Sequence, residues 1–189
     1  QQPMPPGLVA SRSEETVKFA ASRRFGLGVS YDRVDDVARV VEKYKEWCQE
    51  AGWEPARDQL VYRGSIVLAE TDQLAEELME SFKGDGAGRG MPMGAAINRA
   101  VQAARAGKEN DRRQSGPPGG QPDPTRDARG LITFVGGPDT VVKQLKEFHD
   151  HCGMGVVDFG FQQPGIDHSQ VMKELDLFGR EVLPRIKEF

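Results

Sequence analysis

The sequence predicts an α/β protein in which parallel strands alternate with crossover helices. Three observations support this prediction. Short apolar segments rich in β-branched residues recur along the chain, each is followed by a segment with helical periodicity, and Gly, Pro, Ser and Asp residues separate them. Such alternation means parallel strands, because a strand returns in the same direction only after a crossover. A doubly wound sheet and a (β/α)₈ barrel both have this order.

Four segments have the character of buried strands. Each is short and either apolar or rich in β-branched residues, at positions 7–11, 27–30, 60–70 and 155–161. A (β/α)₈ barrel needs eight strands and typically about 250 residues, whereas this chain has 189 residues. A lone half-barrel would leave two parallel edges unpaired, and unpaired edges favour aggregation.

The helices are predicted from caps and from apolar periodicity. The first helix begins at Ser13, a residue that caps helices well, with Glu14 and Glu15 in its first turn and Gly26 as the expected C-cap. The longest helix covers 32–51. Its apolar residues recur at steps of three and four along one face: Val34, Val37, Val40, Val41, Tyr44, Trp47, Cys48 and Ala51.

Three further helices follow. One covers 71–82, with Thr71 or Asp72 near its cap, and another begins at Pro138, because the fixed φ of proline suits the first helical position. A short apolar stretch, 131–135, precedes Pro138. The last helix ends the chain, and its apolar face is marked by Val171, Leu175, Phe178, Val182 and Ile186.

Residues 83–130 differ in composition from the rest of the chain. They are rich in Gly and Pro, as in GDGAGRGMPMG and QSGPPGGQPDPTRDARG, although 95–107 have the pattern of one helix. A loop of this length inside a compact domain is either functional or disordered. The prediction is a single domain over 1–189, interrupted by a mobile loop or insertion at about 83–130.

The composition argues against several other classes. A net charge of −4 argues against a nucleic-acid partner, which needs a basic stripe. No apolar run reaches the ~20 residues that cross a membrane. Two cysteines in a chain of this size do not make a disulfide framework, so Cys48 and Cys152 are expected to be free thiols in a reducing cytoplasm. His149, His151 and Cys152 do not provide the four ligands of a zinc site, so no metal is predicted.

Five motifs follow one another along the chain. They are VASRSEETVKFAASRRFGLGVS, YKEWCQEAGWEP, IVLAETDQLAEE, GGPDTVVKQLKEF and LDLFGREVLPRI. In this order they resemble segments of the luciferase-like flavin-dependent monooxygenases, the bacterial luciferase-like superfamily. The first motif carries Ser13-Glu14-Glu15-Thr16 where the family has a Ser-Pro-Glu-Thr turn, so Glu14 replaces the proline. In the fourth motif, Gly137 stands where the family usually has threonine.

The resemblance covers the C-terminal half of the family's barrel and implies that the four strands are strands five to eight of a (β/α)₈ barrel. It implies a monooxygenase that uses reduced FMN and dioxygen on a small organic substrate, with a flavin reductase as partner. Hydride transfer with a deazaflavin is the alternative within the family. Catalytic groups of such sites come mostly from the other half, so no catalytic residue is named.

A different interpretation is a non-catalytic flavin-binding remnant or pairing subunit. Such a chain would complete its barrel as a homo- or heterodimer, and the unpaired strand edges motivate this alternative. In either case the loop at 83–130 would follow strand seven at the active-site face. It would close over the flavin or form a disordered surface excursion.

The resemblance also assigns the first group of site residues. Ser11, Ser13 and Thr16 follow strand five at a helix N-terminus, where hydroxyl and backbone N–H groups would contact the flavin phosphate. The alternative is a plain helix cap. The carboxylates of Glu14 and Glu15 favour that alternative, because they would repel a phosphate.

Two further groups of residues belong to the predicted site. Gly136 and Gly137 precede a helix and would approach the phosphate closely, unless they form a simple tight turn. Phe161, Gln162 and Gln163 follow the last strand and would face the substrate at the mouth of the active site. Their alternative is a surface loop.

Overall fold

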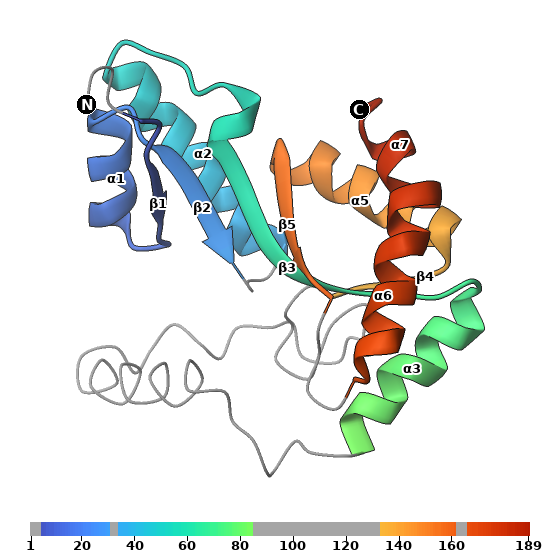
Figure 1. Ribbon diagram of the computed structural model, residues 1–189. Coiled ribbons are helices and arrows are strands. Elements are labelled where there is room, and N and C mark those ends of the chain that lie inside the picture. Colours follow the sequence, from blue (N-terminus) through green and yellow to red (C-terminus); the bar gives the residue numbers. More distant parts are fainter. Residues whose placement is uncertain (1–4, 31–33, 85–132, 162–165) are drawn as a thin grey trace.

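One parallel sheet organises the molecule (Figure 1). The computed structural model describes residues 5–30, 34–84, 133–161 and 166–189. Within these ranges the strands are β1 (Leu8–Ala10), β2 (Gly26–Ser30), β3 (Leu60–Leu68), β4 (Thr133–Gly136) and β5 (Val156–Gly160). Every pairing between them is parallel, as the alternation of strands and helices predicts.

Helices follow the strands along the described parts of the chain. They are α1 (Glu14–Ser22), α2 (Val34–Glu50), α3 (Asp72–Gly84), α5 (Pro138–Cys152), α6 (His168–Leu177) and α7 (Leu183–Ile186). A π-helical turn (Phe178–Val182) joins α6 to α7. The predicted helix at 95–107 and nearly all of the predicted loop lie outside the described residues, so the single-domain prediction stays a prediction.

Strand β3 is the centre of the sheet and has neighbours on both edges. Residues 61–63 pair with β2 and also with β5, so these two strands lie on opposite edges. Ser65 pairs with both Thr133 and Gly160, so β4 follows β2 along the same edge. The order β1-β2-β3-β5 is therefore continuous, as in a barrel. Only an apolar stretch was expected at 131–135, whereas the structure forms β4 there.

The hydrophobic core lies on one face of this sheet. Alternate residues of the strands face it, as the pleat requires: Val9, Leu27, Val29, Leu60, Tyr62, Ile66, Val157 and Phe159. The intervening side chains of Leu8, Arg63, Val156 and Asp158 are exposed. The helices lie in the same order as the strands, because α1 contacts α2, α2 contacts α5 and α5 contacts α7.

The end of α1 corrects one expectation. Gly26 was expected as the C-cap of this helix, and this prediction is wrong. The helix ends at Ser22, Arg23 is its C-cap, and Gly26 is the first residue of β2. The turn between the two elements is made by Arg24 in a left-handed conformation, with φ 58°.

The last helix corrects a second expectation. Leu175 was expected on its apolar face but is 41% exposed, whereas the preceding Glu174 is buried. Val171 and Phe178 are half-buried, and Val182 is buried. The π-helical turn is the physical reason, because it inserts an extra residue and changes the register between the two ends of the helix.

Candidate functional site

A cluster of three hydroxyl side chains lies at the carboxyl end of β1: Ser11, Ser13 and Thr16. The ladder between β1 and β2 extends to Ser11, whose amide donates to the carbonyl of Gly28 at 3.1 Å. The chain then turns, and Ser13 is the N-cap of α1 with an extended backbone. Thr16 lies in the first turn of that helix. The structure thus brings together the three residues that the sequence assigns to a phosphate.

Hydrogen bonds join these hydroxyls to one another. Ser13 Oγ donates to Thr16 Oγ1 at 2.8 Å, and Ser11 Oγ lies 3.2 Å from Ser13 Oγ. Ser11 Oγ also accepts the backbone N–H of Ser13 at 3.2 Å. The Ser13 side chain makes no capping hydrogen bond to the helix. The outward N–H groups of the first turn therefore lack a cap from Ser13, which suits an anionic ligand.

Charged residues surround the hydroxyl cluster. Arg12 is exposed between the two serines, and Glu14 and Glu15 occupy the first turn of α1. Glu46 is the main cause of the raised pKa of Lys43 on α2, and Glu14 adds to the effect. The carboxylates of Glu14 and Glu15 are the feature of this cluster that least suits a phosphate.

The Gly136-Gly137 turn is bonded to a carboxylate of the chain itself. The amide of Gly137, the N-cap of α5, donates to Asp72 Oδ1 at 2.7 Å, and Thr140 Oγ1 donates to Asp72 Oδ2 at 2.9 Å. Gly136 has φ 151°, and a Cβ there would lie 2.8 Å from Thr140 Cγ2. A tight turn that requires glycine explains Gly136, whereas Gly137 has an ordinary φ of −73°. The contact of both residues with a phosphate stays a prediction.

The role of Asp72 could not be predicted from the sequence, because 65 residues separate it from Gly137. The only local signal is an acidic residue soon after a strand. A shallow depression of about 200 Å³ lies beside this contact and is lined by Glu70, Thr71, Asp72, Gly137, Pro138, Asp139 and Thr140. Its three carboxylates would repel a phosphate, so the hydroxyl cluster at β1 is the better candidate.

Phe161 packs in an aromatic cluster. It follows β5 directly, is half-buried, and its ring lies edge-on to Phe178 with centroids 5.4 Å apart. Phe159 lies edge-on to both rings. This packing explains Phe161 structurally, and its role at the mouth of the site stays a prediction. Gln162 and Gln163 lie outside the described residues.

Glu174 is a buried carboxylate that sequence reasoning missed. The side chain is 1% exposed, and its Oε2 accepts the amide N–H of Leu68 at 3.4 Å. Among the described residues, none forms a hydrogen bond with its Oε1. Burial raises the pKa of Glu174, and the amide of Leu68 and the side chain of Gln170 oppose that rise in part. Little in the sequence indicates that Glu174 is buried, since it is a single acidic residue beside the apolar face of the last helix.

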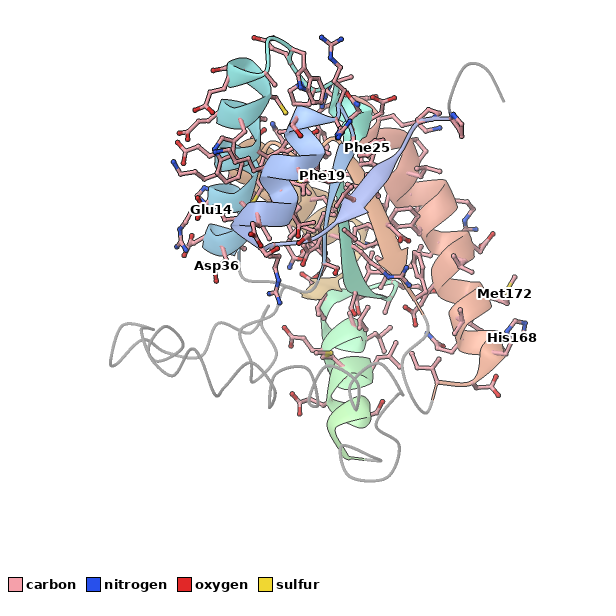
Figure 2. The ribbon with its side chains drawn as sticks, turned by 90° about the vertical axis from the view of Figure 1, so that its left-hand side faces the viewer. Glu14, Phe19, Phe25, Asp36, His168 and Met172 are labelled. Atoms are coloured by element: carbon pink, nitrogen blue, oxygen red, sulfur yellow. The ribbon has the colours of Figure 1, made fainter. Side chains whose placement is uncertain are left out.

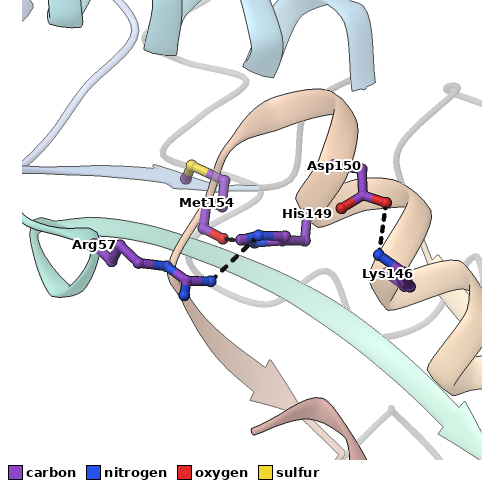
Figure 3. Close-up of polar contacts among 5 residues, drawn as sticks. All are labelled: Arg57, Lys146, His149, Asp150 and Met154. Atoms are coloured by element: carbon purple, nitrogen blue, oxygen red, sulfur yellow. Dashed lines mark hydrogen bonds and ion pairs between the residues drawn. The ribbon is translucent and has the colours of Figure 1, made fainter. Parts of the chain in front are cut away.

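The two histidines of the HDHC segment have separate partners. His149 Nδ1 lies 2.7 Å from the carbonyl of Met154, and its Nε2 lies 3.2 Å from Arg57 Nη2 (Figure 3). A carbonyl only accepts and a guanidinium only donates, so these two contacts fit the imidazole tautomer that carries its proton on Nδ1. His151 faces Asp35 instead, at 3.6 Å. Within the described ranges, no three acidic, His or Cys side chains gather as a metal site.

Both cysteines are free and buried, as free thiols were predicted. Burial raises the pKa of Cys48, and it raises the pKa of Cys152 to about 12. Neither thiol is therefore an activated nucleophile. None of the helices that the structure describes has the length and apolar character of a membrane span.

Three solved structures share the fold of this chain. Monooxygenase RslO1 from Streptomyces bottropensis aligns with TM-score 0.67 and 19% identity, over 97% of this chain and 49% of its own. A second structure is the oxygenating constituent of 3,6-diketocamphane monooxygenase from the CAM plasmid of Pseudomonas putida, in complex with FMN. It aligns with TM-score 0.61 and 21% identity, over 95% of this chain and 48% of its own. The coenzyme F420-dependent tetrahydromethanopterin reductase from Methanopyrus kandleri aligns with TM-score 0.55 and 20% identity, over 96% of this chain and 51% of its own.

The chain spans about half the length of these structures, which are (β/α)₈ barrels. The predicted fold class, half of a luciferase-like barrel, is confirmed. No curated protein sequence matches the chain significantly. A family model described as luciferase-like monooxygenase matches residues 1–153, which is most of the 189 residues. The chain therefore belongs to the luciferase-like monooxygenase family.

Proposed function

We propose that this chain binds the phosphate of FMN in a flavin-dependent monooxygenase that oxidises a small organic substrate with dioxygen. The observation that carries the proposal is the hydroxyl cluster of Ser11, Ser13 and Thr16 at the carboxyl end of β1. Enzymes built on (β/α)₈ barrels place their chemistry at this end of the strands. Family membership and the FMN complex of the diketocamphane monooxygenase constituent support the choice of cofactor.

The residues present fit a phosphate at this position. Hydroxyl groups donate to phosphate oxygens, and the first N–H groups of α1 point in the same direction. The 2.8 Å bond from Ser13 to Thr16 holds the side chains close together. The Ser11 backbone is held by its bond to Gly28 in β2, so the sheet positions the cluster before a ligand binds.

The division of work between protein and cofactor follows from this geometry. FMN, when bound, supplies the electron transfer to dioxygen. The hydroxyl cluster would hold the phosphate end and thereby orient the rest of the cofactor over the carboxyl ends of the strands. A separate flavin reductase would supply the electrons, and Phe161 would contribute an apolar wall near the substrate.

Titration with FMN, followed by flavin fluorescence, tests the proposal on the purified chain. The Ser11→Ala and Thr16→Ala variants should bind FMN about tenfold or more weakly, because each loses a hydrogen bond to a charged group. Ser22→Ala is the matched control, since its hydroxyl bonds to the carbonyl of Phe19 at the other end of α1. Equal affinities in all four proteins, or no saturable binding, would overturn the proposal.

A deazaflavin-dependent oxidoreductase is the second candidate. The F420-dependent reductase from Methanopyrus kandleri has a TM-score of 0.55 against this chain, close to the 0.61 of the FMN-bound structure. Both cofactors carry a phosphate, so the same hydroxyl cluster would serve either one. A competition titration in which coenzyme F420 displaces FMN, or fails to, separates the two candidates.

A further inference from the structure

The sheet face opposite the core carries its residues in rows, because neighbouring strands pair in register. One row is small or apolar and consists of Ala10, Gly28, Val61 and Val156. The next row on this face, two residues closer to the carboxyl ends, is polar: Ser30 on β2, Arg63 on β3 and Asp158 on β5. Beyond it, Ser65 pairs with Gly160. The face therefore becomes polar toward the carboxyl ends of the strands.

Two members of the polar row form an ion pair. Arg63 Nη1 donates to Asp158 Oδ2 at 3.2 Å across neighbouring strands. In the (β/α)₈ barrels that share this fold, the sheet face away from the helices is the barrel interior, which bulky branched residues normally fill. Charges are costly to bury there, so packing does not explain them. Ser65 and Gly160 are small, which leaves the pair within reach of a ligand at the carboxyl ends.

The polar row lies almost level with the hydroxyl cluster. Ser11 continues the pairing with β2 through its bond to Gly28, so Arg63 lies one residue beyond the level of Ser11. Strand β2 lies between β1 and β3 (Figure 1), and two strand spacings amount to about 10 Å. Glu14, labelled in Figure 2, marks the start of α1 and thus the carboxyl end of β1. The ribityl chain of FMN spans such a distance, so a flavin held by its phosphate reaches the polar row.

We propose that Arg63 and Asp158 bind the pyrimidine edge of the flavin ring system. This edge presents an acceptor, a donor and an acceptor in turn: C2=O, N3–H and C4=O. A guanidinium only donates and a carboxylate only accepts, so the ion pair offers a donor for a carbonyl oxygen beside an acceptor for N3–H. A phosphate here would be repelled by Asp158, and a hydrocarbon would leave both charges without a polar partner.

FMN methylated at N3 tests the contact with Asp158, because a methyl group replaces the N3 proton. In a fluorescence titration, wild type should bind 3-methyl-FMN about tenfold more weakly than FMN. Asp158→Ala should weaken FMN binding by a similar factor and abolish this difference. Asp150→Ala is the matched control, because Asp150 is an exposed partner of Lys146 on α5, and it should keep the difference. Equal binding of both flavins by wild type, or a difference that survives Asp158→Ala, would overturn the proposal.

Exchanging the two charges separates ligand binding from a structural role. Arg63→Asp combined with Asp158→Arg keeps an ion pair between β3 and β5 but exchanges the positions of donor and acceptor. We expect this double variant to melt at the temperature of wild type, to bind FMN about tenfold more weakly and to bind 3-methyl-FMN equally. Wild-type affinity and discrimination in the double variant would show a purely structural pair. Circular dichroism verifies folding, and Asp158→Ala decides if the exchanged pair does not fold.

This inference rests on the proposed function, because it concerns the ring end of the same cofactor, yet the two fail in different ways. Failure of the phosphate site appears as equal binding of FMN and riboflavin, which lacks the phosphate. Failure of the ring contact appears as equal binding of FMN and 3-methyl-FMN. A chain without saturable affinity for any of these flavins would overturn both.

Discussion

At the scale of single residues, the carboxylate of Glu174 accepts a backbone hydrogen bond that a neighbouring strand would otherwise accept. The amide of Leu68 points to the edge of β3 that β5 occupies, but the pairing with β5 ends at Ser65. Glu174 Oε2 accepts this amide at 3.4 Å, 106 residues away in the chain. The carboxyl group therefore satisfies a buried backbone donor, and its own ionised form is disfavoured by burial.

The raised pKa of Glu174 predicts a pH dependence of stability. The folded state binds this proton more tightly than the unfolded chain does, so stability decreases as pH rises above the ordinary value of 4.5 toward the raised pKa. Glu174→Gln keeps an acceptor for Leu68 and removes the ionisation. Urea unfolding at pH 5 and pH 8 should therefore show a smaller loss of stability in this variant than in wild type.

The control for this measurement is Glu147→Gln, because Glu147 is exposed on α5 in an ion pair with Lys143. This variant should retain the pH dependence of the wild type. If Glu174→Gln lost as much stability between the two pH values as wild type, burial of this carboxylate would not be the cause.

At the scale of elements, Asp72 fastens the start of α3 to the start of α5. Its two carboxylate oxygens accept the amide of Gly137 and the hydroxyl of Thr140, at 2.7 and 2.9 Å. A carboxylate at this position also interacts favourably with the N-terminal end of the α5 dipole. One side chain thus holds together the two helices that leave the carboxyl ends of β3 and β4.

Asp72→Ala should lower the free energy of unfolding by about 1–3 kcal/mol, because two hydrogen bonds to a charged group are lost. Asp150→Ala is the control, since Asp150 is an exposed partner of Lys146 one turn away on α5. Its loss should stay within about 0.5 kcal/mol. Denaturant unfolding measures both, and equal losses would contradict the role given to Asp72.

The turn between α1 and β2 predicts a substitution that stabilises the protein. Arg24 has φ 58°, a conformation that costs an L-residue with a side chain but suits glycine. Arg24→Gly should raise the melting temperature, with a gain of about 0.5–1 kcal/mol. Arg23→Gly, at φ −104°, should lower it instead. A lower melting temperature for Arg24→Gly would show that the turn carries no strain.

At the scale of the whole molecule, local patterns predict most of the fold and distant contacts explain what they miss. Strands β1, β2, β3 and β5 are each recognisable from a few consecutive apolar residues. Strand β4 has four residues and exists through its pairing with 65–68 of β3. The register change at the π-helical turn, which exposes Leu175, also depends on packing and not on local periodicity.

Part of the candidate site could be predicted from the sequence, and part depends on contacts between distant residues. Ser11, Ser13 and Thr16 lie within six positions of one another, so their proximity could be predicted from the sequence. The bond from Gly137 to Asp72 crosses 65 residues and has no local signature. It changes the interpretation of the Gly136-Gly137 turn, because a carboxylate of the chain already occupies that helix N-terminus.

Comparing FMN with riboflavin, which lacks the phosphate, tests whether the hydroxyl cluster holds a flavin phosphate. We expect wild type to bind FMN at least tenfold more tightly than riboflavin. We also expect Ser11→Ala and Thr16→Ala together to remove this preference without weakening riboflavin binding. Equal affinity for the two flavins in wild type, or a preference that survives both substitutions, would contradict the claim.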